Sequence, residues 1–257
     1  MLGAIVGDVI GSVYERHPIK TTAFPLFQPH SRYTDDTVLT VAVAHAILEG
    51  EPYSDALRRY GRAYPHAGYG GGFKAWLAAP EPRPYESFGN GAAMRVSPVG
   101  FAFDDVDTIL AEARRTAEPS HDHPEGIKGA QATALAVYLA RTARDKEVIR
   151  REIVDRFGYD LDRTVDGIRP GYAFDVTCQG TVPEAIIAFL DSHDYEHAVR
   201  LAVSLGGDSD TLAAITGGIA QAYYGGVPDD IAGEVRSRLP AAFLDVIDRF
   251  SAAYGAP

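Results

Sequence analysis

The chain has 257 residues, 46% hydrophobic and 23% charged, and is long enough to bury a substantial core as an ordinary soluble globular protein. Its formal charge of −11 disfavours binding to nucleic-acid backbones or anionic membranes, although a small basic pocket for one anion is compatible with it. Cys178 is the only cysteine, which excludes disulfide scaffolds and thiolate metal sites within one chain and fits a cytoplasmic protein.

The first expected helix, Leu2–Val13, is apolar enough to suggest a signal peptide, but it has no basic n-region and Asp8 interrupts it. No later segment has the roughly 20 apolar residues of a membrane-spanning helix, so we expect a soluble, unexported protein. Glycines at positions 3, 7 and 11 leave one face bare for close packing of another helix. Asp8 lies beside that face and, if buried, needs partners; it either caps a neighbouring element or supports a polar site.

The next segment, Glu15 to Tyr33, contains three prolines and little periodicity, which predicts a long loop that could act as a lid. Glu15, at its root, is either a site residue or a surface carboxylate at a helix end, where the helix dipole disfavours it. Directly after the loop, Thr34-Asp35-Asp36-Thr37 precedes a helical run, Val38–Leu48. A single helix cap needs only one acceptor side chain, so two adjacent acids indicate something more than a cap.

A Gly-Asn-Gly turn at positions 89 to 91 leads into a further helix start that carries Arg95. Free backbone N–H groups and a guanidinium suit a phosphate or pyrophosphate, whereas the simpler interpretation is a tight turn with a solvated arginine. Farther along, His121 and His123 flank an acid just before a long helix. Such a pair could bind a transition metal, but more often it caps the helix or forms hydrogen bonds.

The stretch Ser204–Thr211 reads Ser-Leu-Gly-Gly-Asp-Ser-Asp-Thr and repeats the pattern of acids and a threonine at a helix start. Carboxylate and hydroxyl oxygens are the ligands of hard cations such as Mg²⁺. If this stretch met Thr34–Thr37 in space, the four carboxylates would repel strongly unless cations lay between them. The two stretches together therefore predict a site for two ions.

Period-2 strands are scarce, and we predict an all-α fold, one domain over residues 1–257 with roughly a dozen helices. Lys146–Phe157 is expected on the surface, and the irregular segment Tyr159 to Thr177 is a second loop near the site. The remaining predicted helices are Ser54–Tyr64, Phe73–Leu77, Asp104–Thr116, Glu125–Ala143, Thr181–Leu190, Tyr195–Leu205, Leu212–Tyr224, Pro228–Leu239 and Ala241–Tyr254.

Four motifs in one order resemble those of the ADP-ribosylglycohydrolases: Gly7 to Glu15, Thr34 to Thr37, Gly89 to Arg95 and Gly206 to Thr211. The resemblance spans the chain from about Leu2 to Tyr224. It implies a single orthogonal multi-helix domain with a binuclear Mg²⁺ site, Mn²⁺ being an alternative, at the centre of an ADP-ribose cleft.

Site residues follow from the resemblance by position. The implied metal ligands are Thr34, Asp35, Asp36, Asp208, Asp210 and Thr211. The implied substrate contacts are Gly89, Asn90, Gly91, Met94, Arg95, Ser97 and one of His121 or His123, with Thr177, Gln179 and Thr181 to Pro183 bordering the cleft. Glu15 and Asp36 are the alternatives for the general base.

The function implied by the resemblance is a Mg²⁺-dependent hydrolase of the N- or O-glycosidic bond between ADP-ribose and a protein side chain or small-molecule acceptor, releasing ADP-ribose. The expected partner is an ADP-ribosylated protein or small adduct, with no nucleic acid or membrane, and the expected state is a monomer. The alternatives are an inactive ADP-ribose-binding or structural protein on the same fold, and a two-metal hydrolase of phosphoesters.

Overall fold

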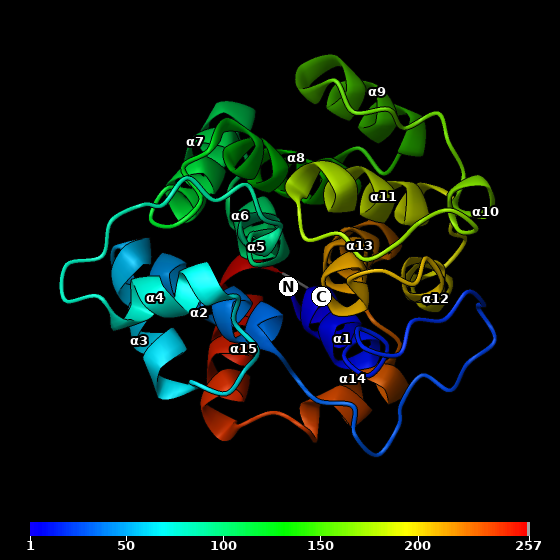
Figure 1. Cartoon of the computed structure of the whole chain (residues 1–257). Helices are drawn as coiled ribbons and strands as arrows, with labels where there is room; N and C mark the ends of the chain where they lie inside the picture. Colours follow the sequence, from blue (N-terminus) through cyan, green and yellow to red (C-terminus); the bar gives the residue numbers. More distant parts are fainter. Residues whose placement is uncertain (256–257) are drawn as a thin grey trace.

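The computed structural model describes residues 1–255, and every regular element in that range is a helix (Figure 1). The prediction of an all-α fold is thereby confirmed. The helices are α1 (Leu2–Gly11), α2 (Asp35–Glu49), α3 (Tyr53–Ala63), α4 (Gly71–Ala78), α5 (Gly91–Met94), α6 (Ser97–Ala102), α7 (Val106–Ala117), α8 (Pro124–Thr142), α9 (Lys146–Phe157), α10 (Val165–Ile168), α11 (Cys178–Leu190), α12 (Tyr195–Ser204), α13 (Ser209–Tyr224), α14 (Asp229–Arg236) and α15 (Ala241–Tyr254). None of these helices combines the length and apolar character needed to traverse a lipid bilayer.

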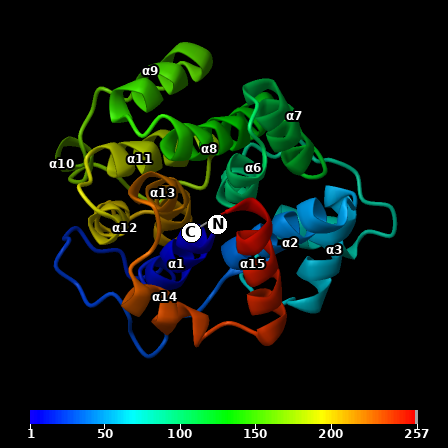
Figure 2. The same cartoon turned by 180° about the vertical axis from the view of Figure 1, so that it is seen from behind.

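Helix α13 lies at the centre of the molecule, where α1, α8, α11 and α12 surround it (Figure 1). It is buried from Ser209 to Ala222, as expected for a helix that is apolar on all sides. Seen from behind, α15 covers α2 on the other side of the molecule (Figure 2). The N-termini of α2 and α13 are the two places where the sequence puts paired acids.

The closest helix contact is between α1 and α13, and it is made by glycine. A Cβ atom at Gly3 would lie 2.4 Å from the carbonyl oxygen of Gly217, and one at Gly7 would lie 2.0 Å from that of Ala213. A methyl group at either position would overlap backbone atoms that cannot move aside independently. The predicted bare face of the first helix is confirmed, and it brings the backbone of α1 directly onto the backbone of α13.

Outer helices bury one face only. In α9, Ile149 and Ile153 are fully buried while most of its charged residues face outward, which confirms the prediction of a surface helix. Asp145 caps this helix by accepting from the N–H groups of Glu147 and Val148.

Several details differ from the sequence-based prediction, and among them α2 and α13 begin three residues before the predicted starts, Val38 and Leu212. Helix α11 begins at Cys178 rather than Thr181, because the side chain of Thr177 caps it by accepting from the N–H of Gly180; Pro183 consequently lies inside the helix. The Gly-Asn-Gly segment forms two short helices, α5 and α6, with a break at Arg95. The segment expected to be irregular contains a single helical turn, α10.

The two long loops, residues 12–34 and 169–177, are joined across the molecule. Lys20 lies on the first loop, and its Nζ donates to the carbonyl of Tyr172 on the second loop at 2.6 Å and to the carbonyl of Leu205. Gly206 follows with φ of +66°, a left-handed conformation, and a Cβ there would lie 2.7 Å from the carbonyl oxygen of Ile19. Both loops are therefore held against the turn that leads into α13.

Candidate metal centre and its cavity

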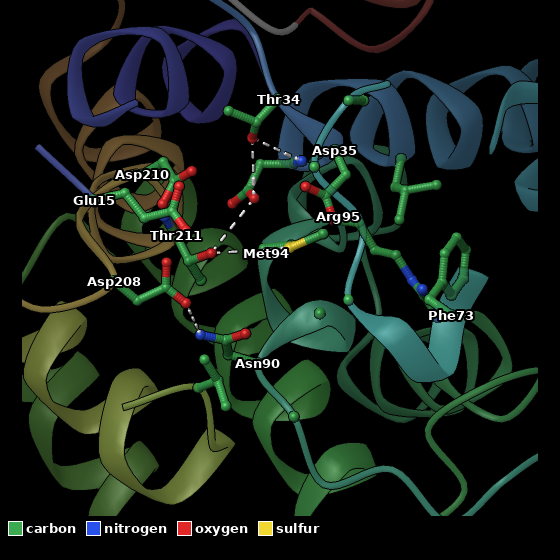
Figure 3. Close-up of a pocket in the computed structure, with 18 of the residues that line it drawn as sticks. Glu15, Thr34, Asp35, Phe73, Asn90, Met94, Arg95, Asp208, Asp210 and Thr211 are labelled. Carbon is green, nitrogen blue, oxygen red and sulfur yellow. Dashed lines mark hydrogen bonds between the residues drawn. The ribbon is translucent and has the colours of Figure 1, made fainter. Parts of the chain in front are cut away.

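The two acidic stretches, far apart in the sequence, meet at the N-termini of α2 and α13. The hydroxyl of Thr211 lies 3.4 Å from Oδ2 of Asp36, although 175 residues separate them. Figure 3 shows Asp208, Asp210 and Thr211 facing Thr34 and Asp35 across one space. The sequence-based expectation that the two stretches come together is correct in this structure.

Asp8 joins them from α1. Its carboxylate accepts from the N–H and the hydroxyl of Thr34 at 2.9 and 2.7 Å, and from the N–H and the hydroxyl of Thr37 at 3.1 and 2.5 Å. One carboxylate oxygen from each of Asp8, Asp36 and Asp210 lies within 4.8 Å of the other two. Asp8 thus caps α2 and also belongs to the acidic cluster, so both interpretations left open by the sequence apply. Asp8 is not among the ligands that the family resemblance implies.

The electrostatics of this cluster favour a bound cation. Asp8, Asp36 and Asp210 are buried, and within residues 1–255 no Lys, Arg or His forms an ion pair with any of them. Burial and the neighbouring carboxylates raise the pKa of Asp36 and of Asp210 well above the usual range. Burial likewise raises the pKa of Asp8, to about 6, although four hydrogen bonds oppose the rise.

One oxygen of Asp36 identifies the chemistry that fits. Oδ1 of Asp36 is buried and has no hydrogen-bond partner. An orphaned carboxylate oxygen is costly in a protein interior, and a hard cation would satisfy it. The surrounding donors are carboxylate and hydroxyl oxygens, which suit Mg²⁺, Mn²⁺ or Ca²⁺ and disfavour soft metals. The residues present therefore fit an oxygen-ligated divalent cation.

Asp35 and Asp208 extend the cluster toward solvent. Burial, with the nearby charge of Asp8 second, raises the pKa of Asp35 to about 7. Asp208 accepts from Nδ2 of Asn90 at 2.7 Å, and burial raises its pKa as well. Asn90 also donates to the hydroxyl of Thr181 at 3.2 Å, so this amide ties α11 to the turn before α13.

The acidic residues lie in a cavity of about 370 Å³, within the range of small-molecule sites (Figure 3). Of the sequence-predicted site residues, the structure brings the following to its wall: Glu15, Thr34, Asp35, Asp36, Gly89, Asn90, Gly91, Met94, Arg95, His121, Asp208, Asp210 and Thr211. Ser97 does not line the cavity, because its side chain is buried against Gly218 of α13, and the segments expected to border the cleft, Thr177, Gln179 and Thr181 to Pro183, do not line it either. The predicted contact of Ser97 with substrate is corrected accordingly.

Backbone pairing fixes the Gly-Asn-Gly loop in the cavity wall. The N–H of Asn90 donates to the carbonyl of Val176 at 2.8 Å, and the N–H of Cys178 donates to the carbonyl of Phe88 at 2.9 Å. Phe174 and Val176 line the cavity, and like Phe88 they are among the exposed large apolar residues of the molecule. Sequence reasoning did not single out these three, because they lie in irregular segments without periodicity.

The structure separates the roles of the two histidines. Nδ1 of His123 accepts from the N–H of Glu125 at 3.1 Å, so this residue caps α8 as the simpler interpretation supposed. His121 is buried and lines the cavity, and burial, with the charge of Arg95 second, lowers its pKa well below the usual range. Of the two, only His121 is positioned to contact a ligand in the cavity.

Arg95 is fully buried, contrary to the simpler expectation of a solvated side chain. Its Nη2 donates to the carbonyl of Thr116 at 2.7 Å and to the hydroxyl of Ser120 at 3.0 Å. Its charge lies 5.9 Å from the ring centroid of Phe73. The break between α5 and α6 places this side chain in the cavity wall, with its guanidinium nitrogens buried rather than in solvent.

Glu15 lines the cavity from the start of the loop (Figure 3). Partial burial and the charge of Asp208 raise its pKa, while Arg16 and Arg32 oppose the rise. The structure therefore places a carboxylate with an elevated pKa beside the acidic cluster but outside its buried core.

The chain is similar to known proteins in sequence and in fold. The sequence model of the ADP-ribosylglycohydrolase family matches residues 1–256 of the chain. ADP-ribosylhydrolase ARH3 of Mus musculus is 28% identical over 88% of this chain and 82% of its own length. ADP-ribosylarginine hydrolase Tri1 of Pseudomonas putida is 25% identical over 90% of this chain and 71% of its own. A solved structure described as an ADP-ribosylglycohydrolase-related protein complex superposes with a TM-score of 0.71, at 27% identity over 97% of each chain.

Proposed function

The chain belongs to the ADP-ribosylglycohydrolase family, and from this premise we propose that it is a divalent-cation-dependent ADP-ribosylhydrolase. It would hydrolyse the N- or O-glycosidic bond that joins ADP-ribose to a protein side chain or a small-molecule acceptor, and release ADP-ribose. We further propose that residues 1–257 form one domain, which the family match over residues 1–256 supports. The observation that carries the proposal is the orphaned oxygen of Asp36 among buried carboxylates, in a cavity large enough for a small molecule.

The residues proposed to hold two ions, Mg²⁺ or alternatively Mn²⁺, are Thr34, Asp35, Asp36, Asp208, Asp210 and Thr211. When bound, the ions supply the Lewis acidity and positive charge that the reaction needs beside the sugar. Asp8 holds Thr34 in place through two hydrogen bonds, and Asn90 holds Asp208 through one. The cluster is thus supported on both sides by residues that need not contact an ion.

The chemistry assigned to the protein's own residues is proton transfer and orientation. Cleavage of a glycosidic bond passes through an oxocarbenium-like state at C1, so water must add as the leaving group departs with a proton. Glu15 is the proposed acceptor of the water's proton, because it lines the cavity and its raised pKa makes it a stronger base than an ordinary glutamate. Asp36 is the alternative base. Gly89, Gly91, Met94 and His121 would hold the rest of the ligand.

The test is release of ADP-ribose from a panel of arginine-, serine- and small-molecule-linked ADP-ribose, with Mg²⁺ and with excess EDTA. We expect Mg²⁺-dependent release from at least one adduct, and loss of both ion binding and turnover in Asp35→Ala and Asp210→Ala. Asp229→Ala removes an exposed acid of α14 and serves as the matched control that retains activity. Release that persists in EDTA and in Asp210→Ala would refute the assigned centre.

The same panel separates the two alternative functions. Binding of ADP-ribose without release from any adduct would indicate a non-catalytic protein on this fold. Appearance of AMP, which forms when the phosphoanhydride bond of ADP-ribose is hydrolysed, would instead indicate attack on phosphorus by a two-metal site.

A further inference from the structure

A chain of hydrogen bonds links the buried guanidinium of Arg95 to the cavity. Nη2 of Arg95 lies 3.0 Å from Oγ of Ser120, and the same Oγ lies 2.8 Å from Nδ1 of His121. All three residues are buried, with Arg95 and Ser120 at 0% exposure. The turn after α7 holds the last two in place, because the N–H groups of Ser120 and His121 both donate to the carbonyl of Ala117.

The direction of these hydrogen bonds follows from the donors available. A guanidinium can only donate, so Oγ of Ser120 must accept from Arg95. The hydroxyl carries one proton, and Nδ1 of His121 is the acceptor within reach. A proton on Nδ1 would make both neighbours donate to Oγ and leave the buried hydroxyl proton without an acceptor, so we assign no proton to Nδ1. Because burial and the charge of Arg95 keep this imidazole neutral, its single proton must reside on Nε2.

The protonated nitrogen points at the ligand-binding loop. Nε2 of His121 would lie 3.0 Å from a Cβ atom at Gly91 and 3.7 Å from one at Gly89, so glycine at these positions leaves the nitrogen uncovered. No described residue is hydrogen-bonded to Nε2, although the ring lines the cavity. The N–H is thus available to an acceptor oxygen of a bound molecule.

Arg95 itself has no nitrogen to offer such a molecule. Its Nε and Nη1 are sealed from solvent without a partner, and Nη2 is engaged by Thr116 and Ser120. Arg95 contributes to the cavity wall, but its donors face the interior behind His121.

We propose that Arg95 and Ser120 are positioning residues that fix His121 in the Nε2–H tautomer, so that it donates a hydrogen bond to an anionic or hydroxyl oxygen of the bound ligand. The choice of ADP-ribose as that ligand rests on the proposed function; the tautomer does not. Arg95, which the sequence suggested as a direct phosphate contact, acts in this proposal through two other side chains.

The first test is independent of any ligand. Long-range ¹H–¹⁵N NMR spectra of histidine-labelled protein distinguish the two neutral tautomers, and the signals of His121 are identified by their loss in His121→Asn. We expect His121 of the wild type to be wholly in the Nε2–H form at neutral pH. Ser120→Ala should give a mixture of tautomers, and Ser120→Thr, which keeps the hydroxyl, should restore the single form. A proton on Nδ1 in the wild type, or an unchanged spectrum in Ser120→Ala, would overturn the proposal.

The second test is calorimetric titration with ADP-ribose in the presence of Mg²⁺. Ser120→Ala should weaken binding by the inverse of the fraction of molecules that keep the Nε2–H form, about twofold for an even mixture of tautomers. The loss should be absent when Ser120→Ala is added to His121→Asn, since the effect passes through the imidazole. An equal loss in both backgrounds would mean a merely structural role and overturn the proposal. A wild type that does not bind ADP-ribose would instead refute the proposed function, leaving the NMR result to decide the tautomer.

Discussion

Replacing Asp36 by asparagine should make the cation-free protein more stable and at the same time remove its response to divalent cations. The side chain keeps its shape in this substitution, so packing in the centre is preserved. What changes is the charge of a buried group whose Oδ1 has no partner and whose neighbours Asp8 and Asp210 have the same sign. Without cations, that charge opposes folding.

The size of the effect can be worked from the geometry. Two ionised carboxylates within 4.8 Å of each other repel by about 3 kcal/mol at an effective dielectric constant of about 20. Partial protonation of the cluster relieves some of this repulsion, so we expect Asp36→Asn to raise the free energy of unfolding by about 1–3 kcal/mol in EDTA. For a chain of 257 residues this corresponds to a melting temperature higher by roughly 5 °C.

The assay is thermal unfolding at pH 8 in EDTA and in Mg²⁺. The wild type should gain about 3 kcal/mol when Mg²⁺ is present at about 100 times its Kd, whereas Asp36→Asn should gain little. Glu184→Gln is the matched control: it removes another buried carboxylate, but one bonded to Arg163 at 2.7 Å. This variant should keep its response to Mg²⁺, because Glu184 lies outside the acidic cluster. A lower melting temperature for Asp36→Asn in EDTA, or a wild type indifferent to Mg²⁺, would refute the reasoning.

Three further outcomes are expected. In EDTA, the free energy of unfolding should fall as the pH rises from 3.8 toward 6, because the pKa of Asp8 is about 6 in the folded state and 3.8 in the unfolded state, so that the folded state binds more protons in this range. Asp8 alone contributes about 3 kcal/mol to this change. A flat pH profile in denaturant titrations would contradict the expectation. Gly7→Ala should lower the free energy of unfolding by about 2 kcal/mol or more, since its Cβ would lie 2.0 Å from a backbone carbonyl, whereas Gly233→Ala, with open space around it, should be neutral or stabilising in the same denaturant titrations. Asn90→Ala should lower kcat/KM for ADP-ribose release about tenfold, because Asp208 loses a hydrogen bond of 2.7 Å, and steady-state kinetics that match the wild type would exclude this supporting role.

Local patterns in the sequence were sufficient to predict most helices and to identify the two acidic stretches, Thr34–Thr37 and Ser204–Thr211. Paired acids at a helix start are readable because a cap needs only one acceptor, and the glycine spacing of the first helix is readable because three side chains are missing from one face. The prediction that these two stretches meet rested only on the resemblance to a family and on the argument that cations would compensate their four carboxylates. The 3.4 Å approach of Thr211 to Asp36 is a property of the tertiary fold.

The features that escaped prediction depend on packing between distant segments. Asp8 enters the acidic cluster because Thr34 and Thr37 donate four hydrogen bonds to it, and nothing near Asp8 in the sequence indicates those partners. Arg95 is buried because the turn after α7 supplies its acceptors. A charged side chain one turn into a helix gives no local sign of such an environment.

The glycine contact between α1 and α13 also bears on which ion the centre prefers. It fixes how closely the α1 backbone that carries Asp8 approaches the α13 backbone that carries Asp210, and no rearrangement of side chains changes this backbone spacing. Mg²⁺ requires oxygens at about 2.0–2.1 Å in near-octahedral array, whereas Ca²⁺ accepts them at about 2.3–2.6 Å. We therefore expect the contact between α1 and α13 to influence which ionic radius the centre prefers. A methyl group added at one of its glycines would move the two helices apart and shift the preference toward the larger ion.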